Sequence, residues 1–193
     1  KWKDRPAIYE YPERKFKKYE VAPGSLSYRI GSLHQGVLPE KIFFFMTPTN
    51  AVQGSYNENP FIYRNQDLKK HSVMIDGKEI YSLECDFSEI GGWVQSYSDF
   101  LDLLGSEIRE SRDMMFYMNA FNEGQFMMGV DLTAKMNNKR GVNDLRKTGT
   151  LSVEFQFRSG STYPFTIFCM STSRGTLSVD KNRKCMIEES DMK

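Results

Sequence analysis

The amino-acid sequence predicts an all-β protein, an antiparallel jelly-roll sandwich of about eight strands with a short helical insertion. Short runs in which apolar and polar residues alternate are separated by Gly, Asn and Pro turns, a pattern typical of half-buried strands. The 14 Phe and 10 Tyr also favour strands. Strands do not alternate regularly with helices, so a parallel α/β sheet is not expected.

The 193 residues are enough for one domain with its own hydrophobic core. We expect an N-terminal arm and edge strand in residues 1–24, the jelly-roll domain in 25–183 and a polar C-terminal tail in 184–193. Because the sequence begins at Lys1 rather than Met, we expect a fragment, a processed product or a trimmed chain.

The first residues, 1–13, have the composition of an extended arm, rich in charged and aromatic side chains. The apolar residues of this arm that could dock on another surface are Trp2, Ile8, Tyr9 and Tyr11. A frayed terminus is the alternative. Residues 15–21 predict an edge strand, because their lysines discourage pairing with a second sheet edge. Leu26, Tyr28 and Ile30 alternate with polar residues and predict the next strand.

Residues 39–65 contain a core strand followed by a long turn. Ile42 to Met46 form an apolar run that is too short for a buried helix, so it predicts a strand buried on both faces. Gly, Asn and Pro then indicate a structured loop that carries aromatic side chains and no reactive group. Tyr56, Phe61 and Tyr63 in this loop are candidate subunit contacts.

An amphipathic helix is predicted in the second half of the chain, and Gly105 is well placed to end it. The apolar residues at helical spacing are Trp93, Tyr97, Phe100, Leu101 and Leu104. Trp93 is the fourth candidate subunit contact. Residues 106–118 hold either a second helical turn or irregular chain.

The other strands follow from the same alternation. They are 72–76 and 79–83, joined by the Asp76-Gly77 hairpin signal, then 126–132, 151–158, 163–170 and a short last strand through Leu177 and Val179. Gly175 precedes this last strand and separates it from the one before. The chain is polar from Lys181 onward.

Catalytic, cofactor-binding and metal-binding residues are not predicted. His34 and His71 lie in different segments without a Cys, Asp or Glu at metal-ligand spacing, so a structural or surface role is favoured. Cys85 is flanked by two carboxylates, which raise the pKa of a thiol and argue against a reactive thiolate. Cys169 lies in an apolar strand and is expected in the core. The chain is therefore not expected to be an enzyme.

Three other groups of side chains allow a second interpretation. Asp99 and Asp102 share a helix face and could bind a cation or act as acid and base, although a solvated face is favoured. The basic residues of a polar loop are Lys135, Lys139, Arg140, Arg146 and Lys147. A plain loop is favoured there, with an acidic neighbouring subunit or a phosphate as the alternative. The clustered methionines, which suit either core packing or subunit contact, are Met114, Met115, Met118, Met127 and Met128.

The overall composition excludes several classes of protein. The 26 basic and 25 acidic residues give a net charge of +1, so an excess of positive charge that would indicate nucleic-acid binding is not present. The sequence contains neither an apolar run long enough for a membrane span nor the apolar core of a signal peptide. The 3 cysteines are scattered and no glycosylation sequon is present, so folding in a reducing intracellular compartment is expected.

Several short motifs occur in an order and spacing that resemble a known family. They are Leu38–Ile42, Gln53–Phe61, the hairpin Val73–Gly77, Val130–Thr133, Gly149–Phe155 and Val179–Arg183. Together they resemble the C-terminal portion of the major capsid (hexon-like) proteins of Polinton or Maverick elements, adintoviruses and related virophage-like viruses. The resemblance covers most of the chain, from about Leu26 to Arg183.

The resemblance implies a double jelly-roll protein whose homotrimers form pseudo-hexagonal capsomers. This chain has room for one jelly roll, so it resembles the second of two, or a separated or domesticated copy. The implied partners are the chain itself and other capsid proteins such as a penton, and the implied location is the virion capsid after synthesis and folding in the host cell. The family has no catalytic residues or cofactors to carry over.

Two other functions compete with this interpretation. A lone jelly roll could be a binding module that grips a glycan or a protein receptor through exposed Trp2, Tyr56, Tyr63 and Trp93. A cupin-type enzyme is the third hypothesis, but the sequence lacks the clustered His and Glu that a cupin metal site needs.

Overall fold

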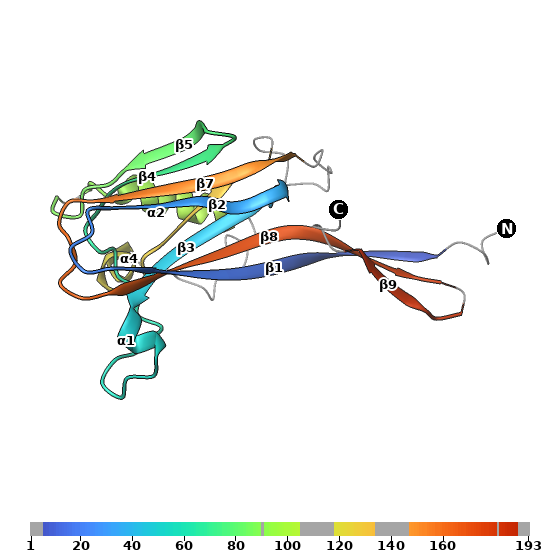
Figure 1. Ribbon diagram of the computed structural model, residues 1–193, viewed down its shortest axis with the longest axis horizontal. Coiled ribbons are helices and arrows are strands. Elements are labelled where there is room, and N and C mark those ends of the chain that lie inside the picture. Colours follow the sequence, from blue (N-terminus) through green and yellow to red (C-terminus); the bar gives the residue numbers. More distant parts are fainter. Residues whose placement is uncertain (1–5, 90, 105–117, 134–146, 181, 189–193) are drawn as a thin grey trace.

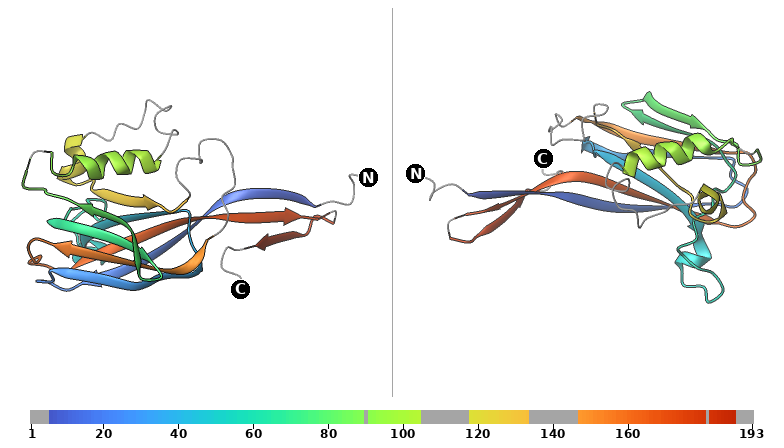
Figure 2. Two further views of the ribbon diagram at one scale, coloured as in Figure 1. Left: turned by 90° about the horizontal axis from the view of Figure 1, so that it is seen from above. Right: turned by 180° about the vertical axis from the view of Figure 1, so that it is seen from behind.

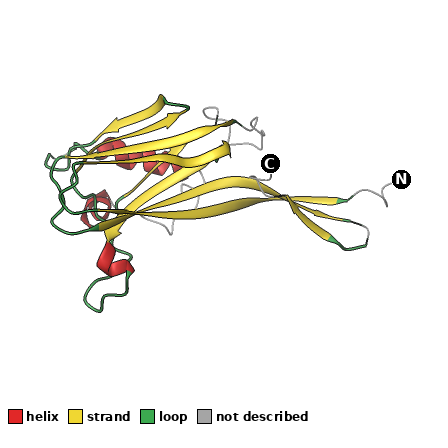
Figure 3. Ribbon diagram, in the orientation of Figure 1, coloured by secondary structure: helices red, strands yellow, loops and turns green. Residues whose placement is uncertain are grey.

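The computed structural model describes residues 6–89, 91–104, 118–133, 147–180 and 182–188 (Figure 1). Strands predominate and the helices are short (Figure 3). The elements are β1 (Ala7–Val21), β2 (Ser27–Val37), β3 (Lys41–Pro48), α1 (Thr49–Val52), β4 (Leu68–Ile75), β5 (Lys78–Glu84), α2 (Val94–Leu104), α4 (Met118–Glu123), β6 (Met127–Asp131), β7 (Thr148–Phe157), β8 (Phe165–Val179) and β9 (Cys185–Glu188).

The strands form two antiparallel sheets that face each other. One sheet has the order β1-β8-β3-β6, with β9 added to β8, and the other has the order β2-β7-β4-β5. Consecutive strands of the first eight therefore tend to change sheet rather than pair, and the β4–β5 hairpin is the exception. This interleaved connectivity is that of a jelly roll, so the predicted fold class is confirmed.

The core lies between the two sheets and follows from the period of two along each strand. On β7, Leu151, Val153 and Phe155 are fully buried. Across the sandwich, Phe44 of β3 meets Phe155 edge to face with ring centroids 5.4 Å apart. An edge-to-face pair of this kind adds about 0.5–1.5 kcal/mol beyond the burial of its area.

The run from Ile42 to Met46 is buried more completely on one face than on the other. Ile42, Phe44 and Met46 have no exposed surface, whereas Phe43 and Phe45 on the outer face are half-buried. The prediction of a strand buried on both faces is therefore correct for the inner face and wrong for the outer face, which is only half-buried. On the outer face, Phe45 stacks on its cross-strand neighbour Phe168 with ring centroids 5.2 Å apart, and the Tyr63 ring packs on it at 4.7 Å.

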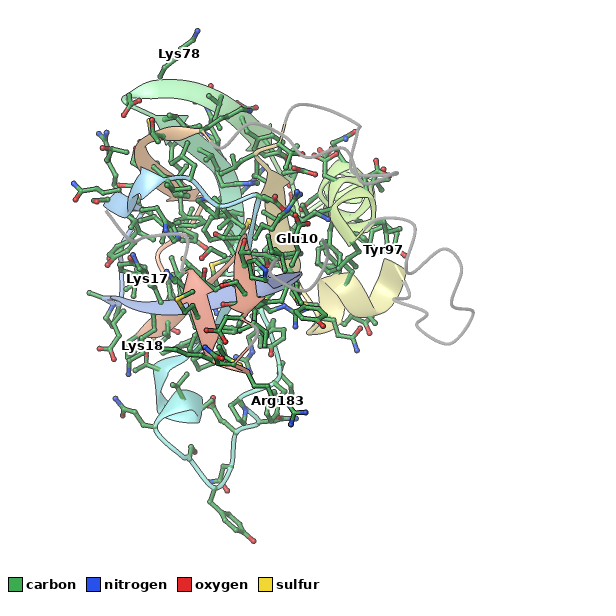
Figure 4. All side chains as sticks on the ribbon, turned by 90° about the vertical axis from the view of Figure 1, so that its right-hand side faces the viewer. Glu10, Lys17, Lys18, Lys78, Tyr97 and Arg183 are labelled. Carbon is green, nitrogen blue, oxygen red and sulfur yellow. The ribbon has the colours of Figure 1, made fainter. Side chains whose placement is uncertain are left out.

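The predicted helix is confirmed as α2, and it closes one open side of the sandwich. Gly129 of β6 lies so close to α2 that an added Cβ would be 2.2 Å from Leu103. On the other side, the Tyr81 hydroxyl of β5 donates a hydrogen bond of 2.5 Å to Asp99 of α2. Tyr97 lies between α2 and α4 (Figure 4) and packs on Phe121 of α4 at 5.3 Å.

The hairpin β4–β5 turns at the predicted position. Asp76 and Gly77 both have positive φ, 51° and 80°, as a two-residue turn that matches the sheet twist requires. Lys78, just after the turn, points away from the body (Figure 4). The carboxylate of Asp76 also accepts a hydrogen bond of 2.7 Å from the Thr150 amide, which ties the turn to β7.

Three predicted strand boundaries were wrong. Leu26 precedes β2 and is 59% exposed, so it is not part of the half-buried alternation. Gly175 does not end a strand, because β8 continues through it to Val179 and the Tyr11 ring lies over the space where a Cβ would be. β1 begins at Ala7 rather than at Lys15, and because residues 7–13 pair with β8, the extended arm and not the frayed terminus is the correct alternative for them.

The remaining predictions fall partly outside the described residues. Met114, Met115 and most of the basic loop lie there, and only Lys147 of that loop is described; its ammonium donates to the Leu132 carbonyl at 2.8 Å. Met128 is buried and Met127 packs against the core, so core packing is confirmed for these two. The boundaries proposed for the 25–183 domain stay a prediction.

Candidate assembly surface

The loop between β3 and β4, residues 49–67, projects from the sandwich body together with α1 (Figure 1). Its base is fixed to the core. The Thr47 hydroxyl donates to the Ile62 carbonyl at 3.1 Å, and the Arg64 amide donates to the Met46 carbonyl at 2.9 Å. Tyr63 forms a parallel bridge with Gln125, which joins the end of the loop to the segment before β6.

The tip of this loop is held by its own polar side chains. The side-chain amide of Asn50 donates to the Glu58 carboxylate at 3.1 Å, and the backbone amide of Ser55 donates to the backbone carbonyl of Asn50 at 3.1 Å. The Asn59 side chain accepts from the Phe61 amide at 2.9 Å. Asn and Ser bond to nearby backbone in this way and so fix a turn without a hydrophobic core.

Three of the four predicted contact residues lie in this loop, and two are strongly exposed. Tyr56 is 101% exposed and Phe61 is 75% exposed. Tyr63 is half-buried, because its ring packs on Phe45 with centroids 4.7 Å apart, and this burial raises the pKa of its hydroxyl. The loop therefore presents Tyr56 and Phe61 outward, while Tyr63 anchors it.

Trp93, the fourth predicted contact residue, differs from Tyr56 and Phe61 because its side chain is buried. It is 8% exposed and stacks on Phe121 with centroids 5.9 Å apart. The prediction that Trp93 is exposed was wrong. The apolar stripe of the helix was identified correctly, but the stripe faces the side of the sandwich and Trp93 turns inward with it.

The carboxylate pair of α2 is also explained by packing. Asp99 accepts the hydrogen bond from Tyr81 and a second one of 2.6 Å from Gln95. The pKa of the Tyr81 hydroxyl is raised, first by burial and second by its hydrogen bond to Asp99. Asp99 therefore attaches α2 to β5, and Asp102 lies one turn of helix further on in an exposed position.

The titratable groups of the core are kept neutral. His71 is fully buried beside the Tyr81 ring, neither ring nitrogen has a hydrogen-bond partner among the described residues, and burial lowers its pKa to about 4. Burial raises the pKa of the Cys85 thiol to about 11 and that of Cys169 to about 12. The predicted direction for the pKa of Cys85 is confirmed, but what raises this pKa is burial first and then the charge of Asp99, rather than the flanking Glu84 and Asp86.

The structure gives no site for a metal within the described ranges. No group of three or more His, Cys, Asp or Glu side chains there is placed to hold an ion. Among the same residues, none of the helices is both long and apolar enough to cross a membrane.

A second exposed apolar area lies at the opposite end of the molecule, on β1 and β9. It includes Ile8, Tyr9, Met186 and Ile187, each more than half exposed. The sequence indicated Ile8 and Tyr9 as docking residues, but β9 was missed. The signal for β9 was the apolar pair Met186-Ile187 within a charged tail.

The two interleaved antiparallel sheets define this chain as a jelly-roll sandwich, and solved structures share this fold. No family model and no curated protein sequence matches the chain. By structure it is similar to a chain of the Sputnik virophage, with a TM-score of 0.55 and 11% identity over 97% of this chain and 40% of that one.

Two further similar structures come from PBCV-1. A chain of the PBCV-1 virus capsid has a TM-score of 0.56 and 7% identity, over 97% of this chain and 52% of that one. The crystal structure of PBCV-1 VP54, fitted into a reconstruction of Sputnik, has a TM-score of 0.56, 9% identity and the same coverage, 97% and 52%. The chain thus spans about half the length of the structures it matches, and identities this low establish the fold alone.

Proposed function

We propose that this chain is a structural virion protein, a jelly-roll domain of a major capsid protein or an endogenous copy of one. One observation carries the proposal. The two-sheet fold of this chain is similar, over 97% of its length and with a TM-score of 0.56, to a chain of a solved virus capsid. The chemistry of the described residues supports the same conclusion, because their buried His and Cys side chains are held neutral inside the core.

In its finer form, the proposal makes this chain the C-terminal one of two jelly rolls in a Polinton- or adintovirus-like capsid protein. The complete protein would form homotrimers, and these would act as pseudo-hexagonal capsomers beside other capsid proteins such as a penton. The chain would be made and folded in the host cell and would reside in the virion capsid. The order of the sequence motifs supports this assignment.

The proposed subunit contact is the projecting loop, through Tyr56 and Phe61. Both side chains are exposed on a backbone that is already fixed by local hydrogen bonds, so little ordering is needed when a neighbour binds. Aromatic residues are enriched at the centres of interfaces, because they bury a large area with few rotatable bonds. Tyr63 supports the loop from below.

The proposal is tested by the association state of the purified chain and of its longer parent. Analytical ultracentrifugation from micromolar to millimolar concentration should detect trimers of the parent, and electron microscopy of expressing cells should detect particles. Phe61→Ala should weaken association of the parent at least tenfold. Ile80→Ala, which removes an apolar side chain of 44% exposure on β5, is the matched control and should have no effect. A parent that stays monomeric without forming particles contradicts the proposal.

A binding module is the second candidate, and the complete exposure of Tyr56 favours it. An exposed ring on a rigid loop suits stacking on a sugar or insertion into a receptor. In that case a glycan array or a pulldown gives a hit that Tyr56→Ala removes, while the parent chain remains monomeric.

A further inference from the structure

The second exposed area belongs to an arm, defined here as residues 7–13 of β1, residues 173–179 of β8 and β9. The arm runs out beyond the two-sheet body in every view (Figures 1 and 2). β3 pairs with β8 only as far as Thr172, so beyond this residue β8 has β1 on one side and β9 on the other. The ammonium of Lys17 donates to the Leu33 carbonyl of β2, a tie between the two sheets close to where the arm begins.

The strand register divides the arm into two faces. Tyr9 pairs with Leu177, and Leu177 pairs with Ile187, so these three side chains form one row across the arm. The next row is Ala7, Val179 and Cys185, and on the other side Tyr11 covers Gly175. By alternation, these residues share the side of the sheet on which Val21, Phe165 and Ile167 enter the core. We call this side the inner arm face.

Beyond Glu13, which forms an ion pair of 3.2 Å with Lys15 at the base of the arm, the inner arm face is apolar and uncharged, and it is open to solvent. Tyr9 is 57% exposed and Ile187 is 55% exposed. The opposite face differs in charge, because its central row includes Glu10 beside Thr176, while its next row, Ile8, Ser178 and Met186, is uncharged. Glu10 therefore places a carboxylate in the middle of the outer face, whereas the corresponding row of the inner face has none.

A single layer of three strands does not bury an apolar face by itself, since a stable sheet packs against a second layer. In the body, the second sheet supplies that layer. In the arm, no other described residue lies in a strand opposite the inner arm face. The same strands thus change from a two-layer to a one-layer structure while their side chains keep the apolar pattern of a core.

We propose that the inner arm face binds the inner arm face of a second copy of this chain, related by a two-fold axis, to form a small two-layer sandwich. A two-fold contact brings identical surfaces together. Beyond Glu13 at the base of the arm, two inner faces meet without a charge, whereas two outer faces would bring Glu10 against its own copy. This inference rests on the proposed function, in which many copies of the chain lie side by side.

The test uses two neighbouring residues of β9 that point to opposite faces. Ile187→Lys places a charge on the inner arm face, and because the contact is symmetric the charge meets itself. Met186→Lys places the same charge on the outer face at a residue of similar exposure, 51% against 55%. Sedimentation equilibrium of the whole chain should show a dimer in the wild type, a dissociation constant at least tenfold higher for Ile187→Lys, and no change for Met186→Lys.

Cys185 gives a second measurement that reports on the arm itself. Its thiol is exposed, while those of Cys85 and Cys169 are buried, so alkylation followed by mass spectrometry follows Cys185 selectively. Alkylation should slow at least tenfold at concentrations where the wild type is dimeric, and it should stay fast in Ile187→Lys. Circular dichroism then confirms that both lysine variants are folded.

The outcomes separate this inference from the proposed function. If copies associate but Cys185 stays reactive, or if Ile187→Lys and Met186→Lys behave alike, the arm is not the contact and the capsid proposal stands. If the chain and its longer parent are both monomeric at every concentration, the arm contact and the capsid proposal are both overturned.

Discussion

His71 allows a quantitative prediction about stability and pH. Its ring lies in the core on β4, paired across the sheet with Phe155 and Leu83 and beside Tyr81, and neither nitrogen atom has a hydrogen-bond partner in the described part of the chain. In the unfolded chain its pKa is 6.5, and in the folded chain burial lowers the pKa to about 4. The unfolded state therefore binds the proton more readily, and the free energy of unfolding falls as the pH drops from about 6.5 towards 4.

The size of this effect follows from the two pKa values. The full loss below pH 4 is about 3 kcal/mol, and at pH 5 it is about 2 kcal/mol relative to pH 7. Replacing His71 by Leu, of similar volume, removes the titrating group. At pH 7 we also expect His71→Leu to be more stable by about 1 kcal/mol or more, because two buried polar atoms without partners are removed.

The assay is urea unfolding of the wild type and His71→Leu at pH 7, 6 and 5, followed by circular dichroism. Most carboxylates stay ionised in this range, and any contribution of His34 is present in both proteins. The difference in unfolding free energy between the two proteins should grow by about 2 kcal/mol from pH 7 to pH 5. If the two proteins lose stability in parallel, the explanation given for His71 is wrong.

Three further substitutions follow from packing, each measured by chemical unfolding. Gly129→Val should destabilise the fold by about 1–3 kcal/mol, because a Cβ would meet Leu103 and the Ile42 carbonyl; an unchanged midpoint would show that α2 can move away. Phe44→Ala should cost about 3–5 kcal/mol, whereas Phe16→Ala, at 61% exposure, should cost little; equal effects would contradict the assigned core. Tyr56→Ala should change stability by less than about 0.5 kcal/mol, and a larger loss would place its ring against the body.

The parts of the fold that were predicted from sequence depend on local patterns. The alternation from Leu151 to Phe157 identifies a strand and its buried face, because both follow from the period of two. Asp76-Gly77 identifies a hairpin, because its backbone requirement is local. The apolar stripe of α2 is also local, and it was predicted with the correct limits to within one residue.

The errors concern contacts between distant parts of the chain. Whether Trp93 is exposed depends on where α2 packs, and that is decided by Phe121 and by the edges of both sheets. Whether Gly175 ends a strand depends on Tyr11, which lies far away in sequence and covers the glycine from the neighbouring strand. Cys185–Glu188 became a strand because β8 offers an unpaired edge beyond the end of β3.

Contacts between distant parts of the chain also limit what could be predicted of the exposed contact surfaces. Tyr56 was correctly expected to be exposed, because the turn-forming residues around it exclude a buried strand. Tyr63 was also expected to be exposed, but it is half-buried, because its burial depends on Phe45 of β3. The inner arm face could not be predicted, because it consists of rows across three strands that only the register brings together.

β8 is continuous from the core to the end of the arm, and this has a mechanical consequence. Its 15 residues span about 50 Å without a hinge. A pull on the arm along the strand direction therefore acts on the whole β1–β8 ladder in shear, so that many hydrogen bonds bear the load together. Because β8 also pairs with β3 in the centre of the sandwich, a neighbour attached to the arm would be connected stiffly to the core of this domain.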